Sequence, residues 1–381
     1  MHPFSFETAG RILFGRGVLR DAHVQVAEFG SRILLVRGGS VPQADTLASE
    51  LTGFGCKLRQ HRSIGEPTVG AVEAAVSAGR AHDATAVVAI GGGSVIDLGK
   101  AAAALIPGPG DVMDHLEGVG GGIPLEQSPL PFVAIPSTAG TGAEVTKNAV
   151  IGVPEAGRKV SLRDARMLAN LAIVDPGLTD GAPRDLTLAA GLDAITQLIE
   201  PYLSSRATPM TDALCQQATP MGLAALMRLM EGEDAGARDR MAYASLMGGL
   251  ALANAGLGAV HGLAGVIGGR FDAPHGALCG RLLPPVLTEN RRALALAGLD
   301  LGRLDRVDAW LADALGVTRD TAVDALAQRL DDLGLPRLGG WLGDDPDLDA
   351  VARDAAGSSS MKANPVALPP DALARILDAA L

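Results

Sequence analysis

Two histidines and one aspartate in the second half of the sequence are candidates for chemistry. His261 and His275 are the only histidines after residue 115, and both lie in uncharged, glycine-rich surroundings (AVHGLAG and DAPHGAL). Asp193 interrupts an apolar, helix-like stretch, and Gln197 follows one turn later on the same face. If the carboxylate and both imidazoles meet, they offer a divalent metal ligands of the 2-His-1-carboxylate type. A packing role for each histidine is the alternative, because a lone histidine in an apolar setting is more often a core residue.

A glycine-rich segment in the first half predicts a phosphate-binding loop. It follows an apolar run, opens a helix-like stretch (GGGSVIDLGK), and begins with Gly91, Gly92, Gly93 and Ser94. Free N–H groups at a helix start bind anions, and residues without Cβ allow the backbone to approach them closely. The spacing matches neither GxGxxG nor the P-loop. A tight strand-to-helix turn is the alternative, in which Asp97 is only a partner of the helix dipole.

A second loop, residues 135–146 (IPSTAGTGAEVT), concentrates hydroxyls and glycines after another apolar run. Ligands of open α/β sheets lie outside the carboxyl ends of the strands. Two such loops together predict a dinucleotide site. Ordinary turn chemistry is the alternative for this second loop.

The elements that must position these residues change character near residue 180. Before it, short apolar runs alternate with helical patterns such as residues 68–80, and the runs span 32–36, 85–90, 131–135 and 171–174. Strands that are apolar on both faces and separated by helices predict a parallel sheet covered by helices. After it, the pattern is helical, beginning with residues 183–203 and with Thr208-Pro209 as the start of the next helix. We therefore expect an α/β domain over 1–180 and an all-helical domain over 181–381.

Composition narrows the class of protein and its partners. The 381 residues are 48% apolar and carry a net charge of −11, which argues against nucleic acid or an anionic membrane as a main partner. Cys56, Cys215 and Cys279 are too few and too widely spaced for a disulfide framework or a CxxC zinc site, so reduced thiols of a cytoplasmic protein are expected. The N-terminus lacks the pattern of a secretory signal.

One uncharged stretch, residues 241–269, is long enough to span a membrane. It is rich in Gly and Ala and contains Asn254 and His261. We therefore expect one or two buried helices that pack closely through small residues, and no membrane insertion.

Taken together, these motifs resemble the iron-containing (group III) alcohol dehydrogenases. The resemblance rests on GGGSVIDLGK, PSTAGTGAEVT, LANLAIVDPGLT, GLDAITQLIEPYLS and the HxxxxxxGxxxxxxHG spacing from His261 to Gly276, in that order along nearly the whole chain. It implies a dehydroquinate synthase-like architecture, with a nucleotide-binding α/β domain, a helical domain and an active site in the cleft. It also implies a homodimer that transfers hydride between NAD(P) and a small alcohol or its aldehyde or ketone.

The resemblance also assigns roles to individual residues. The segment from Gly91 to Ser94 and Asp97 would hold the cofactor pyrophosphate, and Lys159 would reach the ribose. The nicotinamide side would be lined by Ser137, Thr138 and Thr141. The family's metal ligands, for iron or zinc, fall on Asp193, Gln197, His261 and His275.

Two departures from the family pattern affect the expected chemistry. Gln197 stands where a ligand is usually histidine, and Gly265 stands where many members place a proton-handling histidine. The sequence therefore leans toward the maleylacetate reductase branch, which is thought to work without a tightly bound metal. In that case His261 or His275 would donate a proton to the developing alkoxide directly. A catalytically silent dinucleotide-binding protein and a relative that acts on a phosphate or carboxylate substrate are two further hypotheses.

The end of the first apolar run bears on the choice of cofactor. Members that prefer NAD usually have an Asp there, whereas this chain has Arg37, Gly38, Gly39 and Ser40. Without an acid to repel a 2′-phosphate, and with Arg37 and Ser40 to attract one, the segment favours NADP over NAD.

Overall fold

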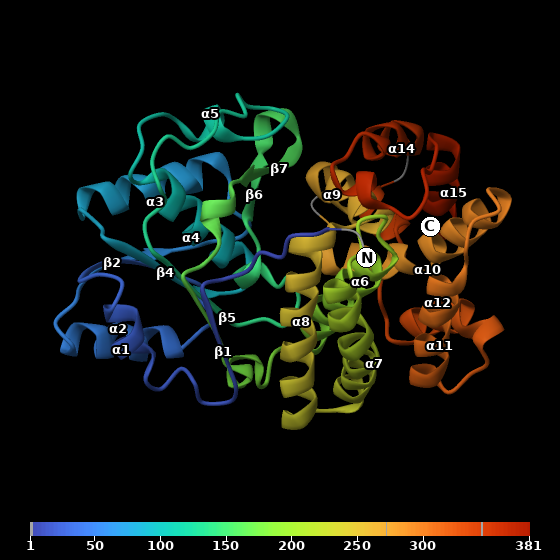
Figure 1. The fold of residues 1–381 in the computed structure, drawn as a ribbon, viewed down its shortest axis with the longest axis horizontal. Helices are drawn as coiled ribbons and strands as arrows, with labels where there is room; N and C mark the ends of the chain where they lie inside the picture. Colours follow the sequence, from blue (N-terminus) through green and yellow to red (C-terminus); the bar gives the residue numbers. More distant parts are fainter. Residues whose placement is uncertain (1–2, 272, 344–345) are drawn as a thin grey trace. The chain divides into compact units, whose positions relative to one another are not determined.

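The computed structural model describes residues 3–271, 273–343 and 346–381, which form two compact units (Figure 1). The α/β unit comprises residues 7–180. The helical unit comprises residues 181–381 together with residues 3–6.

A six-stranded parallel sheet is the centre of the α/β unit. Its order is β1-β8-β5-β4-β2-β3, and every pair of neighbours is parallel. The strands are β1 (Arg11–Phe14), β2 (Arg32–Arg37), β3 (Lys57–Arg62), β4 (Ala86–Gly91), β5 (Phe132–Pro136) and β8 (Leu171–Val174). The chain runs outward from β2 to β3 and then crosses to β4 on the other side of β2. The topological switch point therefore lies between β2 and β4.

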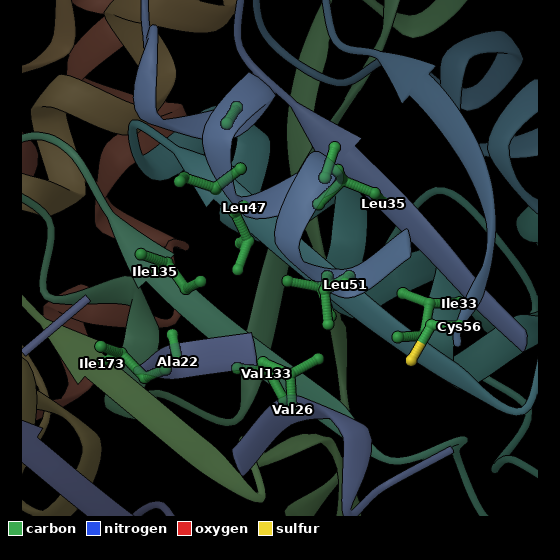
Figure 2. Close-up of a cluster of buried hydrophobic side chains, with 14 of the residues drawn as sticks. Ala22, Val26, Ile33, Leu35, Leu47, Leu51, Cys56, Val133, Ile135 and Ile173 are labelled. Carbon is green, nitrogen blue, oxygen red and sulfur yellow. The ribbon is translucent and has the colours of Figure 1, made fainter. Parts of the chain in front are cut away.

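Helices cover both faces of the sheet, as the apolar character of both strand faces predicts. On one face, α1 (Ala22–Ala27) and α2 (Gln43–Gly53) bury Val26, Leu47 and Leu51 against Ile33 and Ile135 (Figure 2). On the other face lie α3 (Val69–Ala81) and α4 (Gly93–Leu105), since Leu34 faces α3 and Ala89 faces α4. The short α5 (Val112–His115) and an antiparallel hairpin of β6 (Asn148–Val153) and β7 (Arg158–Arg163) complete the unit, with 3-10 turns at Ala143–Val145, Pro154–Ala156, Ala165–Met167 and Pro176–Thr179.

The described part of residues 181–381 contains helices and no strand. The first helices are α6 (Arg184–Leu203), α7 (Pro209–Glu231), α8 (Ala235–Ala255), α9 (Ala259–Phe271) and α10 (His275–Leu296). They are followed by α11 (Gly302–Leu315), α12 (Ala322–Asp332), α13 (Gly339–Leu342), α14 (Leu348–Ala356) and α15 (Pro370–Ala380), with 3-10 turns at Arg319–Thr321 and Ser360–Ala363. The predicted start of α7 is confirmed, because Thr208 forms a capping box with Thr211. The expected fold class, an α/β domain followed by a helical domain, is confirmed.

The uncharged stretch forms parts of two helices. In the described residues no single helix is long and apolar enough to cross a membrane. Only together do α8 and α9 have the length and apolar composition of a membrane span, and the two helices are bent by 99° relative to each other.

Two glycines bring α10 into close contact with α6. A methyl group at Gly276 would lie 2.2 Å from the carbonyl oxygen of Ala189, and one at Gly280 would lie 2.4 Å from Leu192 Cδ1. At Gly276 the opposing atom belongs to the backbone, so only a residue without Cβ permits this separation of the two helices. At Gly280 the opposing atoms belong to the Leu192 side chain, which would have to shift. At Gly265 in α9, by contrast, a methyl group would meet nothing within 4 Å.

This difference gives a matched pair of substitutions. We expect Gly276→Ala to destabilise the protein by about 1–3 kcal/mol, because the added methyl group overpacks a contact with backbone that cannot rotate away. We expect Gly265→Ala to be neutral or stabilising by up to about 1 kcal/mol, because alanine is the better helix former and the space is open. Thermal or urea unfolding of both variants measures the difference, and equal stabilities would contradict the proposed role of Gly276.

Candidate functional site

Three helices of the helical unit bring four metal-binding side chains together. Asp193 comes from α6, His261 from α9, and His275 and Cys279 from the first two turns of α10, and one ligand atom of each lies within 4.8 Å of the others. Asp193 Oδ1 lies 3.3 Å from His261 Nε2 and 3.9 Å from His275 Nε2. Cys279 Sγ lies 3.7 Å from both Nε2 atoms. The predicted meeting of one carboxylate and two imidazoles is therefore present in the structure.

Glu200 fixes which nitrogen of His261 faces this cluster. Its Oε2 lies 2.6 Å from His261 Nδ1, and its Oε1 accepts a hydrogen bond of 2.7 Å from the Val260 backbone N–H. Because an ionised carboxylate can only accept, Nδ1 carries the proton, and in the neutral ring the Nε2 lone pair faces Asp193. Sequence reasoning missed Glu200. The available signal was its position seven residues after Asp193, two turns along the same face of α6.

Gln197 contacts Asp193 through its amide nitrogen. Its Nε2 donates to Asp193 Oδ1 at 2.9 Å. Its Oε1 is buried and has no hydrogen-bond partner in the part of the chain that the structure describes. The amide therefore orients the carboxylate, and its expected role as a metal ligand stays a prediction.

Sequence reasoning also missed Cys279. All three cysteines are free and buried, as expected for reduced thiols, but Cys279 lies among metal-binding groups whereas Cys56 and Cys215 do not. It follows His275 by four residues on α10, so both side chains project from one face of the helix. That spacing was the signal in the sequence.

The electrostatics of the cluster favour positive charge. Cys279 raises the pKa of His275 to about 9, against the opposing effect of burial. Burial also opposes protonation of His261, but Cys279, Glu200 and Asp193 outweigh it and hold the His261 pKa well above its usual value. Burial would raise the pKa of Asp193, yet the neighbouring histidines keep it below the usual range. This environment and the set of N, O and S donors together fit a bound divalent cation.

The two predicted cofactor loops meet in the α/β unit, at the switch point of the sheet. Gly92 caps the start of α4, and the Ser137 N–H donates to the Gly91 carbonyl at 2.8 Å. A methyl group at Gly93 would lie 2.6 Å from Thr141 Oγ1, so the loops are in direct contact. Ser94 and Thr138 are half-buried in these loops. Gly38 joins them from the end of β2, where its N–H donates to the Ile90 carbonyl at 3.1 Å.

Asp97 and Lys159 are held by the hairpin and its surroundings. Asp97 accepts a hydrogen bond of 3.0 Å from the Val150 N–H of β6, and burial raises its pKa to about 6. Lys159 on β7 forms an ion pair with Glu66. Their expected contacts with the pyrophosphate and the ribose stay predictions.

Comparison with known proteins matches both units of the chain to one family. Residues 9–176 match the model of the iron-containing alcohol dehydrogenases, and residues 187–381 match the model of the family's C-terminal region. The chain belongs to the iron-containing alcohol dehydrogenase family. As a member, it is an NAD(P)-dependent oxidoreductase that interconverts an alcohol and its carbonyl compound by hydride transfer, which confirms the expected family and reaction.

Two relatives match over most of the chain. A long-chain-alcohol dehydrogenase of Geobacillus thermodenitrificans is 34% identical over 90% of this chain and 87% of its own length. An NAD-dependent methanol dehydrogenase of Bacillus methanolicus is 29% identical over 97% of both chains. Among solved structures, a 1,3-propanediol oxidoreductase is 28% identical, with a TM-score of 0.90 over the whole length of both chains.

A buried lysine ties the second cofactor loop of this family member to α4. Lys100 is 1% exposed, and its Nζ donates to the carbonyls of Ala143, Thr146 and Asn148 and to the Thr146 hydroxyl at 2.7–2.9 Å. Burial lowers its pKa to about 8, so it remains protonated at neutral pH. The same burial raises the pKa of the neighbouring Glu144 to about 7, which Lys100 only partly offsets.

One part of the cofactor argument was wrong. Arg37 at the end of β2 forms an ion pair with Asp45, from the first turn of α2, so an acid does lie beside this strand end and neutralises Arg37. Asp45 follows Arg37 by eight residues, and the turn into α2 brings it back against the end of the strand. A different arginine lies beside Gly39. Arg62, at the end of β3, is exposed, and a methyl group at Gly39 would be 2.7 Å from its Nη2.

The raised pKa of Glu144 predicts a pH-dependent stability. Its folded-state pKa of about 7 exceeds the usual 4.5. Between these two pH values the unfolded chain gives up the Glu144 proton more readily than the folded protein, so the free energy of unfolding falls as pH rises to about 7. Glu144→Gln removes this loss. We expect the unfolding free energy of the variant, relative to the unsubstituted protein, to increase by roughly 2–3 kcal/mol between pH 5 and pH 8.

Urea unfolding at the two pH values measures this change. Glu73→Gln, on the exposed face of α3, is the matched control and should show no such trend. A pH-independent difference for Glu144→Gln would contradict the proposed cost of burying this carboxylate.

Proposed function

We propose that Asp193, His261 and His275 hold a divalent ion, iron or zinc, at which a small uncharged alcohol, aldehyde or ketone binds. NADP or NAD would bind at the loops from Gly91 to Ser94 and from Ser137 to Thr141. The observation that carries the proposal is the convergence of the Asp193 carboxylate with two imidazole Nε2 atoms, one of them oriented by Glu200. The domain division at 180/181 is part of the same proposal.

When bound, the dinucleotide carries the hydride and the ion polarises the substrate oxygen. The chain's own residues position these groups. Glu200 holds the His261 ring with Nε2 toward the ion site, and Gln197 holds the Asp193 carboxylate. His275 is the exposed member of the cluster, since 37% of its side chain is accessible against 3% for Asp193 and 5% for His261. Substrate therefore reaches the site on the His275 side.

Uncharged substrates are favoured because the nearest arginines on α9 and α10 are already paired. Arg281 is buried, with an ion pair to Asp331 at 2.8 Å and hydrogen bonds to the carbonyls of Leu335 and Pro336. Arg270 pairs with Asp354. Neither is available for a phosphate or carboxylate group, which counts against relatives that act on such substrates.

A cytoplasmic homodimer remains part of this proposal. Three free thiols support a reducing compartment. Strand β1 lies at the edge of the sheet, where a second copy could extend it.

Metal removal tests the function. We expect dialysis against a chelator to lower NAD(P)H-dependent reduction of a short aldehyde at least about 100-fold, with recovery on addition of Zn²⁺ or Fe²⁺, because the ion supplies several kcal/mol of transition-state stabilisation. Asp193→Asn should lose activity to the same extent, whereas Asp378→Asn, exposed on α15, should not.

Full activity in metal-free protein would instead support direct proton donation by the histidines. Cofactor binding without turnover over a broad panel of aldehydes and ketones would indicate a silent binding protein.

The cofactor preference has its own test. We propose that Arg62 and Ser40, both exposed beside Gly39, bind the 2′-phosphate of NADP in place of the neutralised Arg37. Arg62→Ala should lower kcat/KM for NADPH about tenfold, the value of one charge-assisted contact, and leave kcat/KM for NADH unchanged. Arg59→Ala, exposed on the same strand, is the control. Equal effects on NADPH and NADH would contradict this role of Arg62.

A further inference from the structure

We propose that Cys279, and not Gln197, is the fourth protein ligand of the metal centre, and that its thiolate makes this site selective for zinc over iron. The inference rests on the proposed function, because it concerns the same ion. It adds a ligand that the sequence motifs do not indicate. Metal binding would release to solvent the thiol proton and the protons on the two histidine Nε2 atoms, and would leave a thiolate on the ion.

The distances between donor atoms support four ligands around one ion. In a tetrahedral zinc site, bond lengths of about 2.3 Å to sulfur and about 2.0–2.1 Å to nitrogen or oxygen place S and N about 3.6 Å apart and N and O about 3.4 Å apart. The observed Sγ–Nε2 distances are 3.7 Å to both histidines. The Oδ1–Nε2 distances are 3.3 Å to His261 and 3.9 Å to His275. Three of these four distances lie within about 0.2 Å of the tetrahedral values, and the Asp193 Oδ1–His275 Nε2 distance is about 0.5 Å longer than its value.

One cation can contact all four donors of this arrangement. Glu200 lies against His261 Nδ1, so Nε2 faces Asp193 Oδ1 and Cys279 Sγ. In the metal-free protein, protons on the Nε2 atoms bridge these groups, and a divalent cation would take their place.

Gln197 is less suited to be the fourth ligand. Its amide nitrogen, which cannot bind a metal, is the atom that contacts the shared oxygen of Asp193 at 2.9 Å. Turning the amide over would set its oxygen against the carboxylate. Gln197 thus serves the centre by positioning Asp193, and Cys279 is fully buried among the ligands.

The type of donor decides the metal. Two histidines and one carboxylate suit non-haem iron as well as zinc, but a thiolate is a soft ligand that favours zinc. Some catalytic zinc sites expand to five ligands in the transition state, and this site would need the same expansion to admit the substrate oxygen beside four protein donors.

Cobalt(II) provides a test that does not depend on activity. Apo-protein prepared by dialysis against a chelator is titrated with Co²⁺, and we expect the intense near-ultraviolet absorption of a cobalt–thiolate bond. Cys56→Ala and Cys215→Ala should keep this band, because neither residue belongs to the cluster. Cys279→Ser should lose it, and circular dichroism of this variant verifies its fold. Gln197→Ala should keep it.

Competition with a chromophoric chelator measures the selectivity. We expect Cys279→Ser to weaken Zn²⁺ binding at least about tenfold and Fe²⁺ binding by a smaller factor, because the lost donor is soft. Co²⁺ that binds the unsubstituted protein without the thiolate band would overturn the ligand role of Cys279 and leave the dehydrogenase assignment intact. Absence of any Co²⁺ binding would also overturn it. Aldehyde reduction by that metal-free protein would then decide the function separately.

Discussion

The close contact between α6 and α10 is the constraint on which the proposed metal centre depends. Asp193 lies on one of these helices, and His275 and Cys279 lie on the other. Gly276 allows the helices to approach within a distance that any side chain would prevent. The glycine after His275 is therefore part of the site, although it offers no ligand: it sets the distance between the carboxylate and the donors of α10.

The cofactor loops depend on a different kind of constraint, which is the burial of a charge. Among the described residues, no carboxylate lies within hydrogen-bond distance of Lys100, yet its ammonium group contacts four oxygens from residues 143–148. A buried ammonium group needs such partners, and it therefore holds this chain segment against α4. Because α4 also begins at the glycine loop, the helix links both loops to one rigid element. The α/β unit thus carries the cofactor loops, and the helical unit carries the metal-binding side chains.

Sequence patterns predicted the elements whose residues are buried on all sides. The apolar runs became β2, β4, β5 and β8, and the glycine and hydroxyl loops lie at their carboxyl ends as expected. Strand β3 was not predicted, because as an edge strand it has the polar sequence KLRQHR. The hairpin of β6 and β7 was also missed, since it lies outside the main sheet.

Prediction of the site was limited by contacts that depend on how the chain turns and on how its helices pack. Asp193, His261 and His275 were identified by residue type and surroundings. Asp45 beside Arg37 depends on how the chain turns after β2, and no spacing rule indicates that ion pair. Glu200 and Cys279 did carry a signal, in their helical spacing from Asp193 and His275. Their roles in the site could not be inferred without knowing which faces of α6, α9 and α10 meet.

The glycine contacts also have a consequence for how the ion is acquired. Since backbone packing sets the separation of α6 and α10, we expect the four donors to lie close together before an ion binds. Ion binding would then be a local event, unlike that in small zinc modules, in which ligation drives the chain to fold. We accordingly expect that one donor at a time can be replaced, and the ion exchanged, without unfolding of the protein.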